Sequence, residues 1–111
     1  MDRLRHLTKE DMLRGFRGAL RKGSRLFRKK LDDYGVETFK NAGAVGIFLR
    51  MKEKFGRLEN LLSTDTTPNY EAIRDNVLDL FVLEGVLMAM YEEKLVDDDQ
   101  LIKAYRAIMV S

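Results

Sequence analysis

The chain has no cysteine and no tryptophan, and it has one proline and one histidine among its 111 residues. The absence of cysteine excludes disulfide bonds, thiolate metal sites and a thiol nucleophile. The single histidine, His6, excludes most zinc sites and any catalytic triad built on histidine. The only proline, Pro68, lies in the clearest loop of the sequence, residues 63–69, which is rich in turn-forming residues.

Long apolar runs are also missing. A helix needs about 18 to 20 consecutive apolar residues to cross a bilayer, whereas the longest apolar stretch, residues 77–90, is interrupted by Asp79 and Glu84. The N-terminal residues MDRLRHLTKED are charged and do not resemble a secretory signal. We therefore expect no contact with a membrane and a location in the cytoplasm, or in the host cytoplasm if the protein is viral.

Charge is distributed unevenly along the chain. Residues 1–31 contain 11 Lys or Arg and 3 Asp or Glu, a charge of +8, and residues 32–111 contain 9 and 15, a charge of −6. This separation indicates that the basic N-terminal part meets something anionic. Nucleic acid, the phosphates of a nucleotide and the acidic part of a second copy are the three candidates.

Helical spacing of apolar residues predicts an all-α fold, with residues 1–111 forming a single-domain bundle of four to five helices. The predicted helices are a basic one at about 9–31, a second at about 44–62, a buried central one at about 70–93 and a C-terminal one at about 98–109. Between the first two we expect a loop or a short helix. The second helix is expected to bury the side of Phe48, Met51, Phe55, Leu58 and Leu62.

Local signals support the predicted helix ends. Thr8 with Asp11 and Asp97 with Gln100 have the spacing of capping boxes, and Asn69 is a suitable N-cap. Gly35 is placed to end the first helix. Three glycines lower the helix propensity of that first helix, and they favour a break near Gly23–Ser24.

Three carboxylates give the central helix its most distinctive pattern. Glu71, Asp75 and Asp79 recur at every fourth residue, so on a helix they form one stripe in which like charges repel. A hard cation such as Mg²⁺ would neutralise them. Alternatively, the stripe is a solvated edge faced by Arg74 and by lysines of neighbouring helices. Glu84, set among apolar residues, is expected to form a structural buried ion pair, and a role in the site is the alternative.

Arginines recur on one side of the basic helix. This pattern predicts contacts with nucleic-acid phosphates, or alternatively an ordinary solvated face, because no aromatic residues are interleaved to stack on bases. The arginines are Arg14, Arg17, Arg21, Arg25 and Arg28.

The middle of the chain resembles a phage and bacterial family, the nucleotide-modification-associated domain 1 proteins. The resemblance covers roughly residues 30–82, about half of the chain. It is carried by the ordered patterns K-x-x-DYG at residues 30–35, RM-x-EK-x-x-RL-x-NL at residues 50–61 and E-x-I-x-D-x-x-x-DL at residues 71–80. That family is suggested to be related to the MazG-like all-α nucleoside triphosphate pyrophosphatases, which hold Mg²⁺ with carboxylates on paired helices.

The resemblance implies roles for eight residues. Glu71, Asp75 and Asp79 would face the metal, and Glu53 would be a fourth acid if another helix or subunit covers its surface. The cations facing phosphate would be Lys30, Arg50, Lys54 and Arg57. Helix 44–62 lacks the E-x-x-E pair that the pyrophosphatases would carry, which weakens the case for catalysis more than the case for the fold.

Three functions follow from these patterns. The first is binding of a nucleotide or its phosphates through Mg²⁺, with hydrolysis of a nucleoside triphosphate to the monophosphate and pyrophosphate if the protein is an enzyme. The second is binding of nucleic acid by the basic helix. The third is a non-enzymatic interaction module that self-associates, for which a homo-oligomer, and in particular a dimer, is expected.

Overall fold

A computed structural model describes residues 6–63 and 67–110. Within these ranges the chain forms four helices and no strand, which confirms the predicted all-α bundle. The helices are α2 (Lys9–Tyr34), α3 (Val36–Ser63), α4 (Tyr70–Glu92) and α5 (Asp98–Ile108). The predicted loop at 63–69 lies partly outside the described residues. No helix in the described part of the chain combines the length and the apolar character needed to cross a membrane.

The predicted capping residues begin three of these helices. The Thr8 side chain accepts a hydrogen bond from the Asp11 backbone N–H, and the Thr8 N–H donates to the Asp11 carboxylate, each at 3.1 Å. Asp97 and Gln100 form the same reciprocal pair before α5, each at 2.8 Å, and the Asn69 side chain caps α4. These local bonds satisfy N–H groups that would otherwise lack partners, and they fix where the helices start.

The predicted break near Gly23 is wrong, because α2 continues through it to Tyr34. Gly23 is buried where α2 crosses α4, and a Cβ atom there would lie 3.1 Å from two ring carbons of Phe81. The glycine therefore permits a close crossing of two helices. Helix α2 ends at Gly35, as predicted, with the Gly35 N–H donating to the Leu31 carbonyl at 2.8 Å.

Helix α3 is bent at Gly43, where φ is 62° and ψ is −170°. The predicted helix at 44–62 matches the part of α3 after this bend. The part before it, residues 36–42, is the short helix that the sequence allows as an alternative to a loop. It is anchored by Phe39, whose ring meets that of Phe27 edge-on at 5.5 Å.

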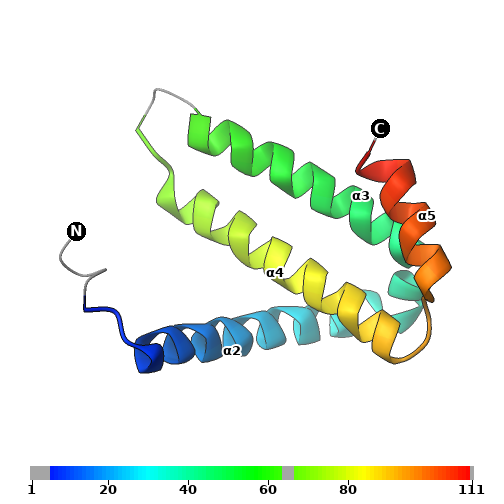
Figure 1. Cartoon of the computed structure of the whole chain (residues 1–111), viewed down its shortest axis with the longest axis horizontal. Helices are drawn as coiled ribbons and strands as arrows, with labels where there is room; N and C mark the ends of the chain where they lie inside the picture. Colours follow the sequence, from blue (N-terminus) through cyan, green and yellow to red (C-terminus); the bar gives the residue numbers. More distant parts are fainter. Residues whose placement is uncertain (1–5, 64–66, 111) are drawn as a thin grey trace.

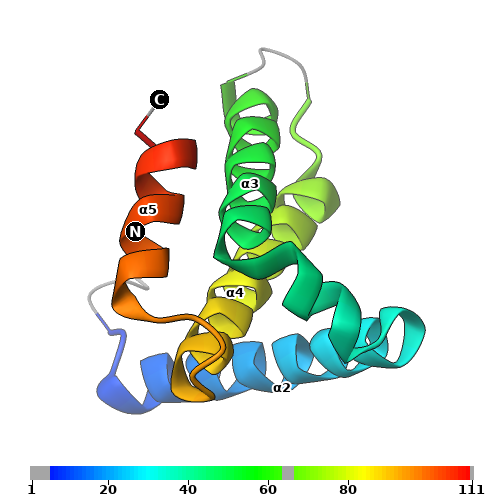
Figure 2. The same ribbon diagram turned by 90° about the vertical axis from the view of Figure 1, so that its right-hand side faces the viewer.

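The helices are stacked so that α4 lies between α3 and α2 (Figure 1). Helices α3 and α4 run side by side in opposite directions, and α2 crosses beneath them obliquely (Figure 2). Helix α5 packs against α3. Residues near the C-terminal end of α2 consequently lie beside α3 and α4, while its first half extends away from them.

The core is formed mainly by α3 and α4, with contributions from Val96 and from α5. The buried side of α3 is rotated from the predicted one: Ile47 is buried, whereas Phe55 and Leu62 are exposed. Helices α4 and α5 approach α3 from different directions. The spacing of apolar residues along α3 alone therefore did not reveal which side of α3 they cover. Among the described residues the buried apolar side chains are Ala44, Ile47, Met51, Leu80, Val82, Leu83, Val86, Met90, Val96 and Ala104.

Burial of α4 is less complete than its sequence predicted. Val77, Glu84 and Met88 are exposed, because only the side of α4 that faces α3 and the point where α2 crosses it are covered. The prediction of a buried ion pair at Glu84 is therefore wrong. An exposed carboxylate is solvated by water and needs no buried partner.

Candidate functional site

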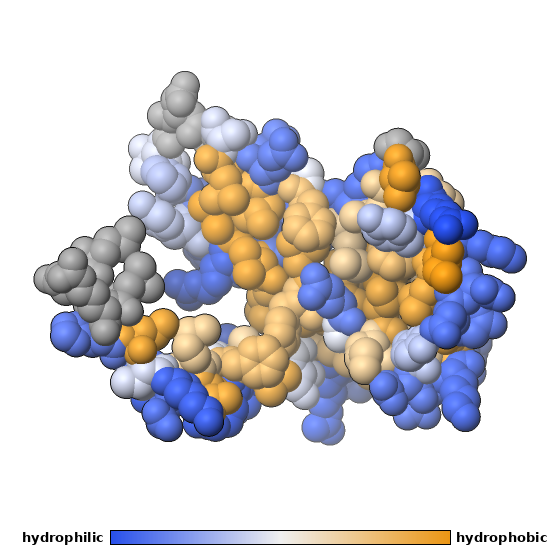
Figure 3. All heavy atoms as spheres, viewed as in Figure 1, coloured by the Kyte–Doolittle hydropathy of each residue, from blue (hydrophilic) through white to orange (hydrophobic). Residues whose placement is uncertain are grey.

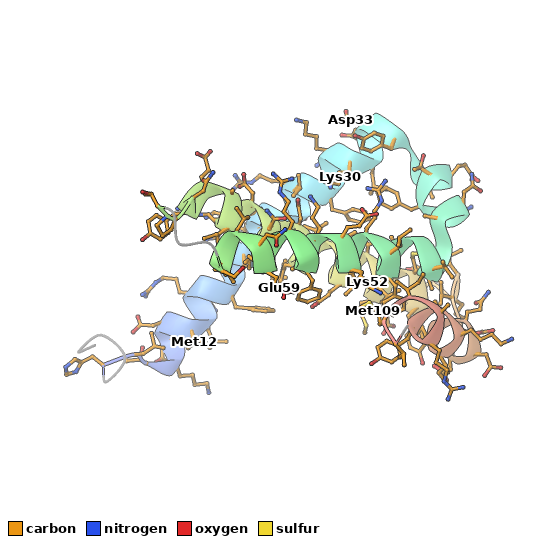
Figure 4. The ribbon with its side chains drawn as sticks, turned by 90° about the horizontal axis from the view of Figure 1, so that it is seen from above. Met12, Lys30, Asp33, Lys52, Glu59 and Met109 are labelled. Carbon is orange, nitrogen blue, oxygen red and sulfur yellow. The ribbon has the colours of Figure 1, made fainter. Side chains whose placement is uncertain are left out.

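Five of the eight residues singled out from the sequence line a single hollow of about 540 Å³. They come from three helices that are distant along the chain: Lys30 from α2, three residues from α3 and Asp79 from α4. Figure 4 shows Lys30 on one side of α3, with Lys52 and Glu59 on the other. We call this hollow the polar hollow; it is lined by Lys30, Gly46, Leu49, Arg50, Glu53, Lys54, Asp79 and Leu83.

An ion pair joins α3 to α4 at the polar hollow. The Lys54 Nζ atom lies 2.8 Å from Asp79 Oδ2, and the two side chains are 33% and 22% exposed. Partial burial strengthens such a pair relative to one at the open surface. Lys54 therefore neutralises Asp79. This is the alternative to a metal ion that the sequence left open, in which a lysine of a neighbouring helix faces the carboxylate.

The charges that remain in the polar hollow favour an anion. With Lys54 and Asp79 paired, Lys30 and Arg50 contribute two positive charges and Glu53 contributes one negative charge. Within residues 6–63 and 67–110, neither Lys30 nor Arg50 forms an ion pair. Two cations without carboxylate partners can bind the oxygen atoms of a phosphate by charge-assisted hydrogen bonds.

A second, smaller cavity of about 150 Å³ adjoins the polar hollow. The two share Lys30, Arg50 and Leu83, so the cations stand at the boundary between them. We call the smaller cavity the apolar chamber. Its lining is mostly hydrophobic and consists of Lys30, Tyr34, Thr38, Phe39, Ala42, Ile47, Arg50, Val82, Leu83 and Val86.

Sequence reasoning did not assign Tyr34 or Thr38 to the site. Both lie where α2 gives way to the short helical segment, and the Thr38 hydroxyl donates to the Tyr34 carbonyl at 2.7 Å. Tyr34 belongs to the K-x-x-DYG pattern, which was the one signal that could have identified it. Tyr34 and Arg50 line the same cavity although they lie on different helices, and helical periodicity does not indicate that arrangement.

The other predicted site residues lie outside the polar hollow. Glu71 and Asp75 are exposed on the first turns of α4, and Arg57 is exposed on α3. Glu71, Asp75, Asp79 and Glu53 do not come together as a metal site, since no group of three or more potential ligands of this kind occurs among the described residues. A step of four residues turns a helix by about 40° beyond a full turn. The three carboxylates of α4 therefore point in successively different directions, and only Asp79 faces α3.

The five arginines of α2 are exposed, as both interpretations of that helix predicted. They lie on the side of α2 away from the buried Gly23. Arg14 forms an ion pair with Asp11 at 2.6 Å. The row is accessible to a polyanion, and binding of nucleic acid stays a prediction.

Comparison with protein-family models, curated proteins and solved structures gives no match for this chain. The resemblance to the nucleotide-modification-associated family therefore stays a prediction, and the polar hollow is the feature from which a function is to be inferred.

Proposed function

We propose that the protein binds a nucleotide, with the phosphates in the polar hollow and the less polar part of the ligand in the apolar chamber. One observation supports this most strongly: five residues chosen from the sequence for phosphate and metal chemistry line one hollow, although they lie on three helices. The volumes of about 540 and 150 Å³ suit a small ligand.

In this proposal Lys30 and Arg50 bind the phosphates. A guanidinium group can contact two phosphate oxygens at once, and the Lys30 ammonium group adds a compact positive charge. Both stand where the two cavities meet, so a ligand with an anionic end and an apolar end would be held in one orientation. Leu83 and Val86 would contact its apolar end.

Mg²⁺ fits this site only together with the phosphates. Proteins hold Mg²⁺ with one or two carboxylates and leave its other positions to water and phosphate oxygens. Glu53 and Asp79 are the two carboxylates of the polar hollow, and Asp79 would have to exchange Lys54 for the ion. We therefore propose that the metal and the nucleotide bind together.

Hydrolysis is the stronger form of this proposal. Water would attack the α-phosphorus of a nucleoside triphosphate, the bond from that phosphorus to the α–β bridging oxygen would break, and pyrophosphate would leave. Glu53 would accept a proton from the water, since Asp79 would by then have left Lys54 for the metal ion. Binding without turnover would show that only the first part is correct.

Thermal unfolding tests the binding. A ligand that binds only the folded chain at 100 times its dissociation constant stabilises it by about 2.7 kcal/mol. At about 4 °C or more per kcal/mol, the midpoint should rise by roughly 10 °C. We expect this rise with Mg²⁺ plus one of a panel of nucleoside triphosphates, and we expect Arg50→Ala or Lys30→Ala to abolish it.

Arg57→Ala is the matched control, since Arg57 lies on the same helix as Arg50 but outside the polar hollow. Asp75→Ala is the control for the acids. Neither substitution should change the rise. If Asp75→Ala abolished it and Arg50→Ala did not, the ligand would bind to the exposed start of α4 and the proposed site would be wrong.

Nucleic-acid binding by the arginine row of α2 is the second candidate, and the exposure of all five side chains favours it. With five phosphate contacts, the logarithm of the binding constant should fall with the logarithm of the salt concentration with a slope of about −4 to −5. Removal of Mg²⁺ should not change the binding constant. The cytoplasmic location stays a prediction.

A further inference from the structure

Helix α2 carries a regular apolar stripe that its neighbours cover over only half of its length. Leu13, Phe16, Leu20, Gly23 and Phe27 are spaced by three and four residues, which aligns them on one side of the helix. Gly23 and Phe27 pack against the rest of the chain. Leu13, Phe16 and Leu20 remain 43%, 55% and 48% exposed.

This uncovered stripe forms one side of an open notch. Figure 3 shows the notch between the first half of α2 and the ends of α3 and α4, with hydrophobic side chains along α2 and both hydrophobic and hydrophilic side chains on the other side. Phe81 of α4 connects the two sides, since its ring meets that of Phe16 on α2 edge-on at 6.0 Å. Val77, one turn before Phe81 on α4, is also exposed. We define the notch by Leu13, Phe16, Leu20, Val77 and Phe81.

The chain exposes far more surface than a compact monomer of its size. Its accessible surface is 8872 Å², whereas a folded monomer of 12.9 kDa exposes roughly 6,300 Å². Its radius of gyration is 16.3 Å, whereas about 13 Å is typical of a compact domain of this length. The excess, on the order of 2,500 Å² per chain, lies at the upper end of the roughly 1,000 to 2,500 Å² that each subunit of an obligate dimer buries.

We propose that the notch is the interface with a second copy of this chain, and that the first half of α2 of each copy lies in the notch of the other. One surface of the chain contains both the protruding helix and the opening that receives it. Two copies related by a two-fold axis would therefore bury both features in one interface. The same stripe that fits α4 within one copy would then be covered along its whole length.

Charge also favours a second copy. Four of the five arginines of α2 lie well away from the exposed part of the apolar stripe, and Arg17, one turn from both Leu13 and Leu20, would line the edge of the interface with its aliphatic stem while its guanidinium group stays in water. The basic N-terminal part of one copy, residues 1–31 with a charge of +8, would approach the acidic part of the other, residues 32–111 with a charge of −6. Nucleic acid would contact the arginine side and would leave the stripe exposed.

Molar mass in solution tests the proposal. Light scattering after size exclusion should give twice 12.9 kDa for the natural chain, and Leu13→Glu should give 12.9 kDa with its helical circular dichroism retained. Ile102→Glu is the control, because Ile102 lies on α5, away from the notch, and is 46% exposed. It should remain a dimer. A monomeric natural chain, or a dimer that Leu13→Glu leaves intact, would overturn the proposal.

Thiol labelling provides a second test that introduces no buried charge. The chain has no cysteine, so Leu20→Cys and Ile102→Cys each carry one thiol, at positions that are 48% and 46% exposed in a single copy. Labelling at position 20 should slow at least tenfold as the protein concentration is raised through dimerisation, and labelling at position 102 should not change. Equal rates at all concentrations would refute the interface. Neither test depends on nucleotide binding.

Discussion

The crossing of α2 over α4 at Gly23 gives a prediction with a definite sign. Replacing a helical glycine by alanine normally stabilises a helix by about 1 kcal/mol, because alanine loses less conformational freedom on folding. A methyl group added at Gly15 would have no atom of a neighbouring helix or side chain within 4 Å, so the Gly15→Ala variant should show the full gain. Both glycines lie in α2, which makes Gly15→Ala the matched control.

At Gly23 the same methyl group meets a neighbour. It would lie 3.1 Å from the Cδ1 and Cε1 atoms of Phe81 and 3.5 Å from Cγ2 of Val82. The Phe81 ring must then move by a few tenths of an ångström, and Phe16 on its edge hinders that movement. Overpacking of this kind destabilises by about 1 to 3 kcal/mol. We therefore expect Gly23→Ala to destabilise by about 1 kcal/mol net, roughly 2 kcal/mol below Gly15→Ala.

Urea unfolding followed by far-ultraviolet circular dichroism measures this difference as a shift of midpoint at constant slope. All variants must be compared at one chain concentration, because association would add to the apparent stability. If Gly23→Ala were as stable as Gly15→Ala, the two helices would not approach closely at Gly23. The position of α2, and with it Lys30, would then be wrong.

Two further predictions concern Asn76 and Tyr91. Asn76 is buried, its Nδ2 donates to the Ala72 carbonyl at 2.8 Å, and its Oδ1 has no partner among the described residues. The Asn76→Leu variant should therefore be more stable by about 1 kcal/mol in urea unfolding. A loss of stability would show that Oδ1 is satisfied. The Tyr91 hydroxyl donates to Asp98 at 2.6 Å, and this bond raises the pKa of Tyr91 above its ordinary value. The bond therefore contributes stability below the ordinary tyrosine pKa, and the contribution is lost as pH rises through the raised pKa. Absorbance titration of the phenolates should show a late-ionising group that Tyr91→Phe removes, and an unchanged titration would contradict the bond.

Helix ends were predictable because the interactions that set them are local. The Thr8–Asp11 and Asp97–Gln100 pairs connect residues three apart, so the sequence itself displays them. The continuity of α2 was not predictable in this way. Gly23 lowers helix propensity wherever it occurs, and only the proximity of Phe81 shows that its lack of a side chain serves packing. Tertiary contact overrides local propensity at such positions.

The site was predicted in part for a similar reason. Spacing along α4 grouped Asp79 with Glu71 and Asp75, but the structure pairs Asp79 with Lys54, which is 25 residues earlier in the chain. No period of a single helix relates those two positions. The order of the resemblance patterns did identify Lys30, Arg50 and Glu53, whereas Thr38 was missed because its place depends on a bend between two helical segments.

The bend at Gly43 sets one wall of the apolar chamber apart from the main part of α3. Residues 36–42 stand between Gly35 and Gly43, whose φ angles are 80° and 62°, in a conformation that residues with a Cβ atom avoid. This short segment supplies Thr38, Phe39 and Ala42 to the wall of the apolar chamber, while the buried core residues of α3, Ala44, Ile47 and Met51, lie after the second glycine. If the chamber binds a ligand as proposed, substitutions at Thr38 or Ala42 should change the size of ligand that it accepts and leave the buried core of α3 and α4 intact.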